Sequence, residues 1–272
     1  MSRPVAQGGG FAVPRPTRVV TTLIAVNVAA YVLQLVLLRT SAAFVVDGLM
    51  LTPRDVYQRG FVWQLFTYGW LHAPSAPGHL LMNMLWLWLF GTQMEGWWGP
   101  KRFLKAYGIF VVAGGLLTVL VSLLCEISAL SAVAPGFPST PHLGASAASL
   151  GVTVSWGLVH AKREMQFFLL GRMTGGTFVL LIVGIEILVA LSFSNTSSTA
   201  HFGGILAAVI LGRGLWRPAR WRELFRKAGL RMRKAKLEKE LRDLSRGGRS
   251  KKPPKDWRVI DGGDPDDPKK WN

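Results

Sequence analysis

Two short stretches decide how this sequence is read: GASAASLGVT at residues 144–153 and AHFGGILAAVILG at residues 200–212. In each, a polar residue and small residues recur at spacings of three and four, which puts them on one face of a helix. These residues are Ser146, Ser149 and Thr153 in the first stretch and His201, Gly204, Ala208 and Gly212 in the second. Small residues at such spacings let membrane helices approach closely. The plain interpretation is tight packing alone; the alternative is that the faces meet and bring the Ser146 hydroxyl to the His201 imidazole.

The hydropathy pattern around these stretches predicts a membrane protein. Only 17% of the residues are charged, against about 25% in an ordinary soluble domain. A hydrocarbon core of about 30 Å needs about 20 apolar residues per helix. Six apolar runs approach that length: residues 19–38, 79–96, 103–125, 144–160, 174–193 and 200–216. We therefore predict an all-α polytopic membrane protein, built as a bundle of six transmembrane helices.

The first run and the loop charges predict the topology. The run at 19–38 is longer than the apolar core of a signal peptide and ends at Arg39, so we expect a retained helix. Lys and Arg, which favour the cytoplasmic side, follow the second and fourth runs: Lys101, Arg102, Lys105, Lys162, Arg163 and Arg172. Residues 126–142 and 194–199 contain neither. Both termini are predicted to be cytoplasmic, and the aromatic-rich segment 39–78 is predicted to lie partly in the outer leaflet.

The C-terminal tail is basic. From Arg213 onward there are 20 Lys or Arg and 9 Asp or Glu, which supply most of the net charge of +17. We expect a helix to about residue 246 and disorder beyond it, facing anionic lipid. Nucleic-acid binding is not expected, because no reading module is recognisable. The expected organisation is a cytoplasmic N-terminal segment (1–18), a membrane domain (19–216) and the tail (217–272).

Three of the predicted spans carry polar residues at one depth. The predicted topology puts the outer ends of the second, fourth and sixth spans at residues 79, 144 and 200. Within about one turn of those ends lie His79 and Asn83, then Ser146, then His201. Polar side chains inside a membrane are costly and mark function by default. We therefore expect one functional site just beneath the outer surface.

These side chains suit acyl transfer. A serine hydroxyl is a weak nucleophile until an adjacent base takes its proton, and His201 is the only candidate base facing Ser146. The tetrahedral intermediate needs fixed hydrogen-bond donors, which His79, Asn83 and the backbone N–H of Ser146 would supply. The five histidines lack metal-ligand spacing and no His-Glu-x-x-His motif is present, so no metal or other cofactor is expected.

Acidic residues are scarce in the predicted spans. No aspartate lies between Asp55 and Asp243, so the sequence favours a Ser–His dyad over a triad with aspartate. Glu186 is the lone charge of the fifth run; we expect a structural polar contact, with proton or water handling or a lateral gate as the alternative. Glu95, with Arg102 nearby, is expected to fix the cytoplasmic turn.

Taken in order, these motifs resemble the rhomboid family of intramembrane serine proteases over roughly residues 61–212. They are Leu71-His72, His79-x-x-x-Asn83, Glu95-x-x-x-Gly99 with Arg102-Phe103 and Tyr107, Gly144-Ala145-Ser146, and Ala200-His201-x-Gly203-Gly204. The resemblance implies a rhomboid-like six-helix bundle with Ser146 as nucleophile and His201 as base. It also implies His79 and Asn83 as oxyanion donors, with Gly144, Gly204 and Glu95 in structural support.

The resemblance further implies cleavage of the transmembrane segments of other membrane proteins, near the outer face and at small residues where a helix unwinds easily. Two alternatives stay open. One is a catalytically inactive rhomboid-like protein that binds transmembrane helices; the other is a transporter or channel with a His/Glu proton relay. The presence of both Ser146 and His201 favours the protease. The short loops suit a bacterial inner (cell) membrane.

Overall fold

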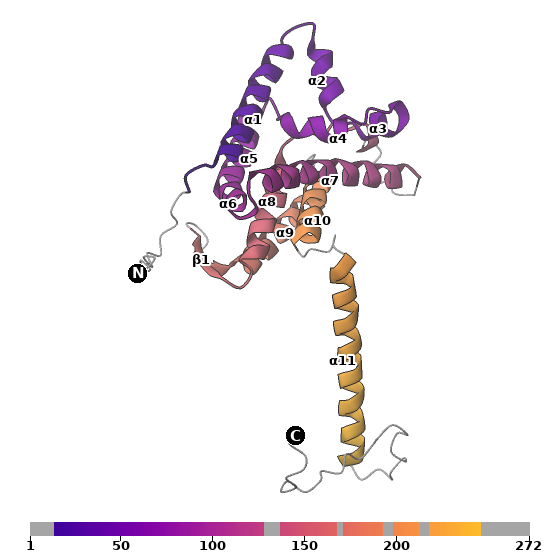
Figure 1. Ribbon diagram of the computed structural model, residues 1–272. Helices are drawn as coiled ribbons and strands as arrows, with labels where there is room; N and C mark the ends of the chain where they lie inside the picture. Colours follow the sequence, from indigo (N-terminus) through magenta and orange to yellow (C-terminus); the bar gives the residue numbers. More distant parts are fainter. Residues whose placement is uncertain (1–13, 128–136, 168–170, 193–197, 213–217, 246–272) are drawn as a thin grey trace, which may run out of the picture. The chain divides into compact units, whose positions relative to one another are not determined.

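The computed structural model describes residues 14–127, 137–167, 171–192, 198–212 and 218–245. It divides into two compact units, Met1–Trp216 and Arg217–Asn272. The N-terminal part of the first unit contains α1 (Arg18–Leu37), α2 (Ala43–Leu49), α3 (Pro53–Arg59), α4 (Gln64–Thr67), the 3-10 helix η1 (Tyr68–Trp70) and α5 (Pro77–Trp86). The helices continue with the π-helical η2 (Leu87–Gly91), α6 (Thr92–Trp98), α7 (Pro100–Ile127) and the 3-10 helix η4 (Phe137–Ser139). They end with α8 (Ser146–Val159), α9 (Gly175–Leu191) and α10 (Ser198–Gly212) (Figure 1).

One short antiparallel hairpin departs from the all-α prediction. It pairs β1 (Glu164–Phe167) with β2 (Gly171–Thr174) in the loop between α8 and α9, with Glu164 opposite Thr174. The second unit contributes α11 (Pro218–Ser245), which is helical as expected. The disorder expected beyond residue 246 lies outside the described residues.

Helices occupy all six of the apolar runs. In the second run, α5, η2 and α6 follow one another with helical backbone angles at both junctions, so the run is one rod with a π-helical turn inside it. On length and composition, α1 and α7 are long and apolar enough to cross a membrane, whereas α8, α9 and α10 are apolar but shorter. That all six helices cross a bilayer stays a prediction.

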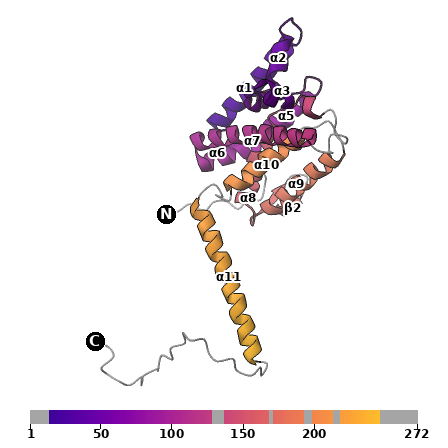
Figure 2. The same cartoon turned by 90° about the vertical axis from the view of Figure 1, so that its right-hand side faces the viewer.

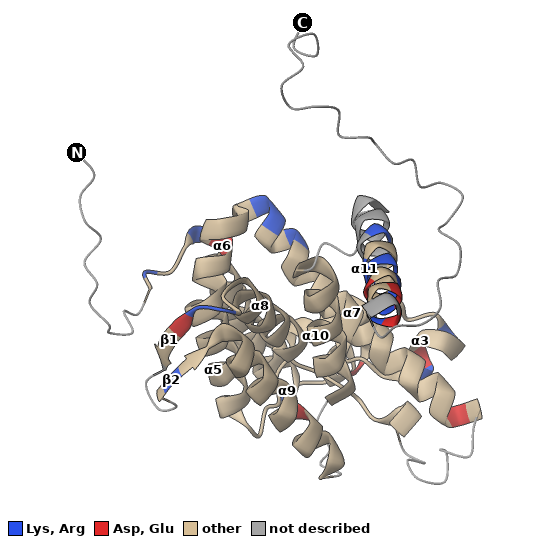
Figure 3. Ribbon diagram, turned by 90° about the horizontal axis from the view of Figure 1, so that it is seen from below, with Lys and Arg blue, Asp and Glu red and all other residues tan. Residues whose placement is uncertain are grey.

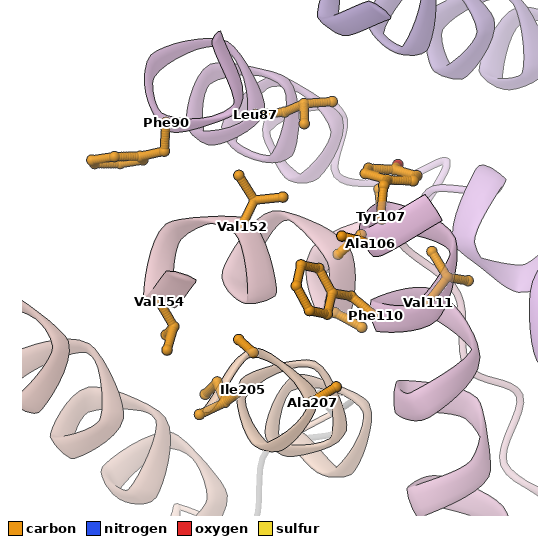
Figure 4. Close-up of a cluster of buried hydrophobic side chains, with 14 of the residues drawn as sticks. Leu87, Phe90, Ala106, Tyr107, Phe110, Val111, Val152, Val154, Ile205 and Ala207 are labelled. Atoms are coloured by element: carbon orange, nitrogen blue, oxygen red, sulfur yellow. The ribbon is translucent and has the colours of Figure 1, made fainter. Parts of the chain in front are cut away.

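The helix α8 lies at the centre of the core. Most of its side chains are buried. Figure 4 shows Val152 of α8 between Leu87 and Phe90 on one side and Ile205 and Ala207 of α10 on the other. A helix surrounded by protein can be shorter than the hydrocarbon core, because its irregular ends are then buried in protein rather than exposed to lipid.

The outward faces of this bundle are apolar. Large apolar side chains on α1, α7, α9 and α10 are exposed, for example Leu33, Leu120, Leu180 and Leu206. Figure 3 shows the bundle helices almost free of charge, with Lys and Arg gathered where α6 meets α7. Exposed apolar surface this extensive marks a membrane or protein interface, so these faces fit a lipid environment.

Glycines bring α10 against the backbones of α7 and α8, which it runs beside in both views (Figures 1 and 2). A Cβ at Gly204 would lie 2.0 Å from the carbonyl oxygen of Ala147, and one at Gly203 would lie 2.5 Å from that of Ala113. At the far end of the same face, a Cβ at Gly212 would meet Leu158 at 3.5 Å. The helices α8 and α10 therefore pack face to face, as the spacing of small residues predicted.

The carboxylate of Glu95 caps α1. It accepts hydrogen bonds from the backbone N–H groups of Val19 (3.2 Å) and Val20 (3.0 Å) and from the hydroxyl of Thr17. A carboxylate at a helix N-terminus accepts hydrogen bonds from N–H groups that have no partner within the helix. Its negative charge also interacts favourably with the positive end of the helix dipole. At the turn after α6, the backbone carbonyl of Glu95, not its side chain, accepts a hydrogen bond from Gly99 N–H at 2.8 Å. The side chain thus joins α6 to α1 rather than pairing with Arg102.

The first predicted outer segment is folded onto the residues that precede α8. The buried Gln64 accepts from Thr52 N–H (3.0 Å) and donates to Gly48 O (3.3 Å), which ties α4 to α2 and to the residue before α3. Leu51 and His142 exchange two backbone hydrogen bonds, at 3.0 and 2.8 Å. These contacts fix the backbone just before Ser146.

Candidate active site

Ser146 and His201 meet at adjacent helix ends. Ser146 is the first residue of α8, and His201 lies three residues after the start of α10. The Ser146 Oγ and His201 Nε2 atoms are 2.8 Å apart, within hydrogen-bond distance. Ser146 is 7% exposed and the His201 side chain 16% exposed. The hydroxyl therefore lies beside a base that can take its proton, in a site that is nearly closed to solvent.

The backbone turn before α8 needs a glycine at position 144. Gly144 has a φ of +131°, which side-chain-bearing residues rarely adopt. Its N–H donates to Tyr68 O at 3.0 Å, so η1 fixes the turn from behind. A Cβ on Gly144 would lie 2.9 Å from Nε2 of His79 and 3.4 Å from Oγ of Ser146. The absence of a side chain thus lets the His79 ring lie close to the serine.

Asn83 is buried beside α8. Ser149, one turn after Ser146, donates to the backbone carbonyl of Asn83 at 3.2 Å. The Asn83 side-chain amide nitrogen is buried and has no hydrogen-bond partner among the described residues. A buried donor left unpaired costs about 1–3 kcal/mol, so this N–H₂ group is available to a ligand oxygen. The two predicted oxyanion donors thus approach α8 from α5, His79 beside Gly144 and Asn83 beside Ser149.

The helix α9 adds a side chain that the dyad prediction did not include. Glu186 Oε2 lies 2.7 Å from His201 Nδ1, on the side of the ring opposite Ser146. The sequence does lack aspartate in the predicted spans, but a glutamate supplies the same functional group. Three side chains therefore form a chain of contacts, Ser146–His201–Glu186, where the sequence favoured two.

The structure places Glu186 and His201 at similar distances from adjacent helix ends. Glu186 lies five residues before the end of α9, and His201 three residues after the start of α10. At about 1.5 Å per residue, these positions are about 7.5 Å and about 4.5 Å from neighbouring helix ends. The lone charge of the fifth run and the histidine of the sixth therefore lie at nearly one depth.

His72, in the outer segment, lies behind this site. Its ring meets that of His79 edge to face, with 5.3 Å between centroids. Burial, and secondarily the neighbouring His79, lowers the pKa of His72 to about 4. His72 is therefore neutral at pH 7 and packs against the candidate oxyanion donor without adding charge.

Comparisons with known proteins agree with this geometry. Residues 59–218 match the sequence model of the Rhomboid domain family, and this range contains all of the side chains described above except those of α1 and the segment before residue 59. The Rhomboid protease GluP of Bacillus subtilis is 28% identical over 160 residues, which cover 59% of this chain and 27% of GluP. RHOMBOID-like protein 12, mitochondrial, of Arabidopsis thaliana is 29% identical over 201 residues, 71% of this chain and 56% of that protein.

A third relative is Rhomboid protein 1, mitochondrial, of Saccharomyces cerevisiae, which is 30% identical over 139 residues, 49% of this chain and 37% of the yeast protein. The matched part of this chain thus spans between about a quarter and about half of the length of these relatives. Because the Rhomboid match extends over more than half of the sequence, the chain belongs to the rhomboid family.

Proposed function

We propose that this protein is an intramembrane serine endopeptidase that cleaves transmembrane segments of other membrane proteins near the outer face of the membrane. The observation that carries the proposal is the 2.8 Å contact between Ser146 Oγ and His201 Nε2. Members of the rhomboid family are integral membrane proteins, and one relative of this chain is named a protease. Both reacting groups that such an enzyme needs are present and in contact.

The reaction follows from the roles that these atoms can take. His201 Nε2 accepts the Ser146 proton while Oγ attacks the scissile carbonyl carbon, which gives a tetrahedral intermediate. The His79 ring, the Asn83 amide and the N–H of Ser146 at the start of α8 donate to its oxyanion. The imidazolium then protonates the leaving amine as the C–N bond breaks. Water, deprotonated by His201, hydrolyses the acyl-enzyme and restores Ser146.

The membrane setting proposed here has six spans, with both termini in the cytoplasm of a bacterial inner membrane. Residues 19–216 form the membrane domain, and residues 217–272 form a basic tail that faces anionic lipid. The exposed apolar faces of α1, α7, α9 and α10 support lipid contact. The Lys and Arg residues where α6 meets α7, beyond the end of the second span, support the orientation.

Covalent labelling with a fluorophosphonate tests the assignment of the nucleophile. Purified wild-type protein in detergent should form one adduct, and peptide mass spectrometry should locate it at Ser146. Ser146→Ala should form none, whereas Ser155→Ala should label like the wild type, because the Ser155 hydroxyl donates to Gly151 O within α8 and lies away from His201. Labelling of Ser146→Ala would contradict Ser146 as the nucleophile, and no adduct on folded wild type would favour the inactive helix-binding protein.

Asn83→Ala should lower kcat for a transmembrane substrate by about 10²–10³-fold with little change in KM, the usual effect of removing one oxyanion donor. The melting temperature should hold, since the amide nitrogen has no partner to lose in the described structure. Ser149→Ala is the matched control, because it removes a hydrogen bond to the Asn83 carbonyl and no donor to the oxyanion. The kcat of Ser149→Ala should fall by less than about tenfold. Equal kcat values for the two variants would contradict the assignment of Asn83.

A further inference from the structure

A third side chain, that of Glu186, contacts the Ser146–His201 pair. Glu186 comes from α9, and its Oε2 atom lies 2.7 Å from His201 Nδ1. The opposite ring nitrogen, Nε2, lies 2.8 Å from Ser146 Oγ. We propose that Glu186 is a positioning residue that fixes the tautomer and orientation of His201, so that Nε2 faces Ser146 as a proton acceptor. This inference rests on the proposed protease function.

The tautomer follows from the hydrogen-bond capacity of each group. A neutral imidazole has one N–H donor and one acceptor nitrogen, and an ionised carboxylate only accepts. Opposite an ionised Glu186, Nδ1 therefore carries the proton and donates it to Oε2. The lone pair of Nε2 is then free to accept the hydrogen bond from the Ser146 hydroxyl. With the reverse tautomer Nε2 would carry a proton, and His201 could not act as a base toward serine.

The orientation of the ring depends on the same contact. Among the described residues, His201 makes no aromatic ring contact. A serine hydroxyl rotates freely and fixes little. Of the two side chains that contact the ring nitrogens, Glu186, held in the helix α9, is therefore the one that can fix the orientation of His201.

The charge of Glu186 is isolated, which strengthens its effect on His201. The helices α8, α9 and α10 contain no other Asp, Glu, Lys or Arg. The side chain of Glu186 is only 13% exposed, so water screens the interaction less than at a surface. When Ser146 gives up its proton, His201 becomes an imidazolium next to this carboxylate. The pairing lowers the energy of that charged state relative to the neutral ground state, as the buried carboxylate of a serine-protease triad does.

Substitution of Glu186 in the full-length, reconstituted protein tests the proposal. Glu186→Gln keeps the shape but can present an N–H₂ group to Nδ1, which selects the wrong tautomer. Its kcat should fall by about 10–10³-fold at unchanged KM, less than the ~10⁴-fold of a fully buried triad carboxylate. The rate of fluorophosphonate labelling should fall in parallel. Glu186→Asp, which restores the charge one methylene shorter, should recover at least about tenfold over Glu186→Gln.

Gly184→Ala, in the same helix and with open space around its Cβ, is the control and should behave like the wild type. Wild-type kcat and labelling rate in Glu186→Gln, or a loss explained entirely by a smaller folded fraction or a higher KM, would overturn the proposal. Equal loss in Glu186→Asp and Glu186→Gln would also overturn it. Wild-type labelling at Ser146 that is insensitive to Glu186 would refute this inference alone, whereas a folded wild type that neither labels nor cleaves would refute the proposed function.

Discussion

Alanine at either Ser146 or His201 should lower the rate of substrate cleavage by about 10⁶-fold, which places it at the detection limit. Ser146 supplies the atom that becomes acylated, and His201 is the base within 2.8 Å of it. Neither role has a substitute among the described residues of α8, α9 and α10. Because the two groups act as one unit, the double variant should be no slower than either single variant.

The measurement is cleavage of a fluorogenic transmembrane substrate by protein reconstituted in vesicles, with melting temperature as the check on folding. His160→Ala is the matched histidine control. His160 lies at the opposite end of α8, where its Nδ1 atom is 2.9 Å from the Trp156 carbonyl oxygen. It should retain at least about half of the wild-type rate, as expected for a residue outside the reacting unit. Cleavage by Ser146→Ala at the wild-type rate would end the protease proposal.

The packing of α8 against α10 was predictable because it depends on small residues and on their spacing along each helix. Small residues at intervals of three and four define a face, and only small residues allow backbones to approach as closely as Gly204 and Ala147 do. The depth of Ser146 and His201 followed from the ends of apolar runs. Both properties are local to one helix at a time, so the sequence contains them directly.

The contact of Glu186 depends on a property that the sequence of α9 does not contain. That helix is apolar on all sides, so no polar face reports how it is rotated about its own axis. The rotation is set by packing: Phe178, Val179 and Ile182 are buried, while Leu180 and Leu188 are exposed. Similarly, the π-helical turn η2 and the β1–β2 hairpin arise from how neighbouring elements fit, which hydropathy alone does not specify.

Gly204→Ala should damage the protein as severely as any single methyl group added to the helices of the first unit. The new Cβ would lie 2.0 Å from the Ala147 carbonyl oxygen and 2.7 Å from its carbonyl carbon, and backbone atoms cannot rotate away as a side chain can. The helices α8 and α10 must separate, at a cost of more than about 3 kcal/mol. A shift of about 1 Å between reacting groups costs about 10²-fold in rate, so labelling of Ser146 should fall at least that far.

Gly212→Ala is the matched control for this prediction. It adds the same methyl group to the same face of α10, where the nearest atom is Leu158 Cδ1 at 3.5 Å. Alanine also favours a helix over glycine by about 0.5–1 kcal/mol, so this variant should melt at or slightly above the wild-type temperature and label at the wild-type rate. Thermal unfolding in detergent and labelling kinetics measure both variants. If Gly204→Ala matched Gly212→Ala in both, the close backbone contact that brings His201 to Ser146 could not be as the structure has it.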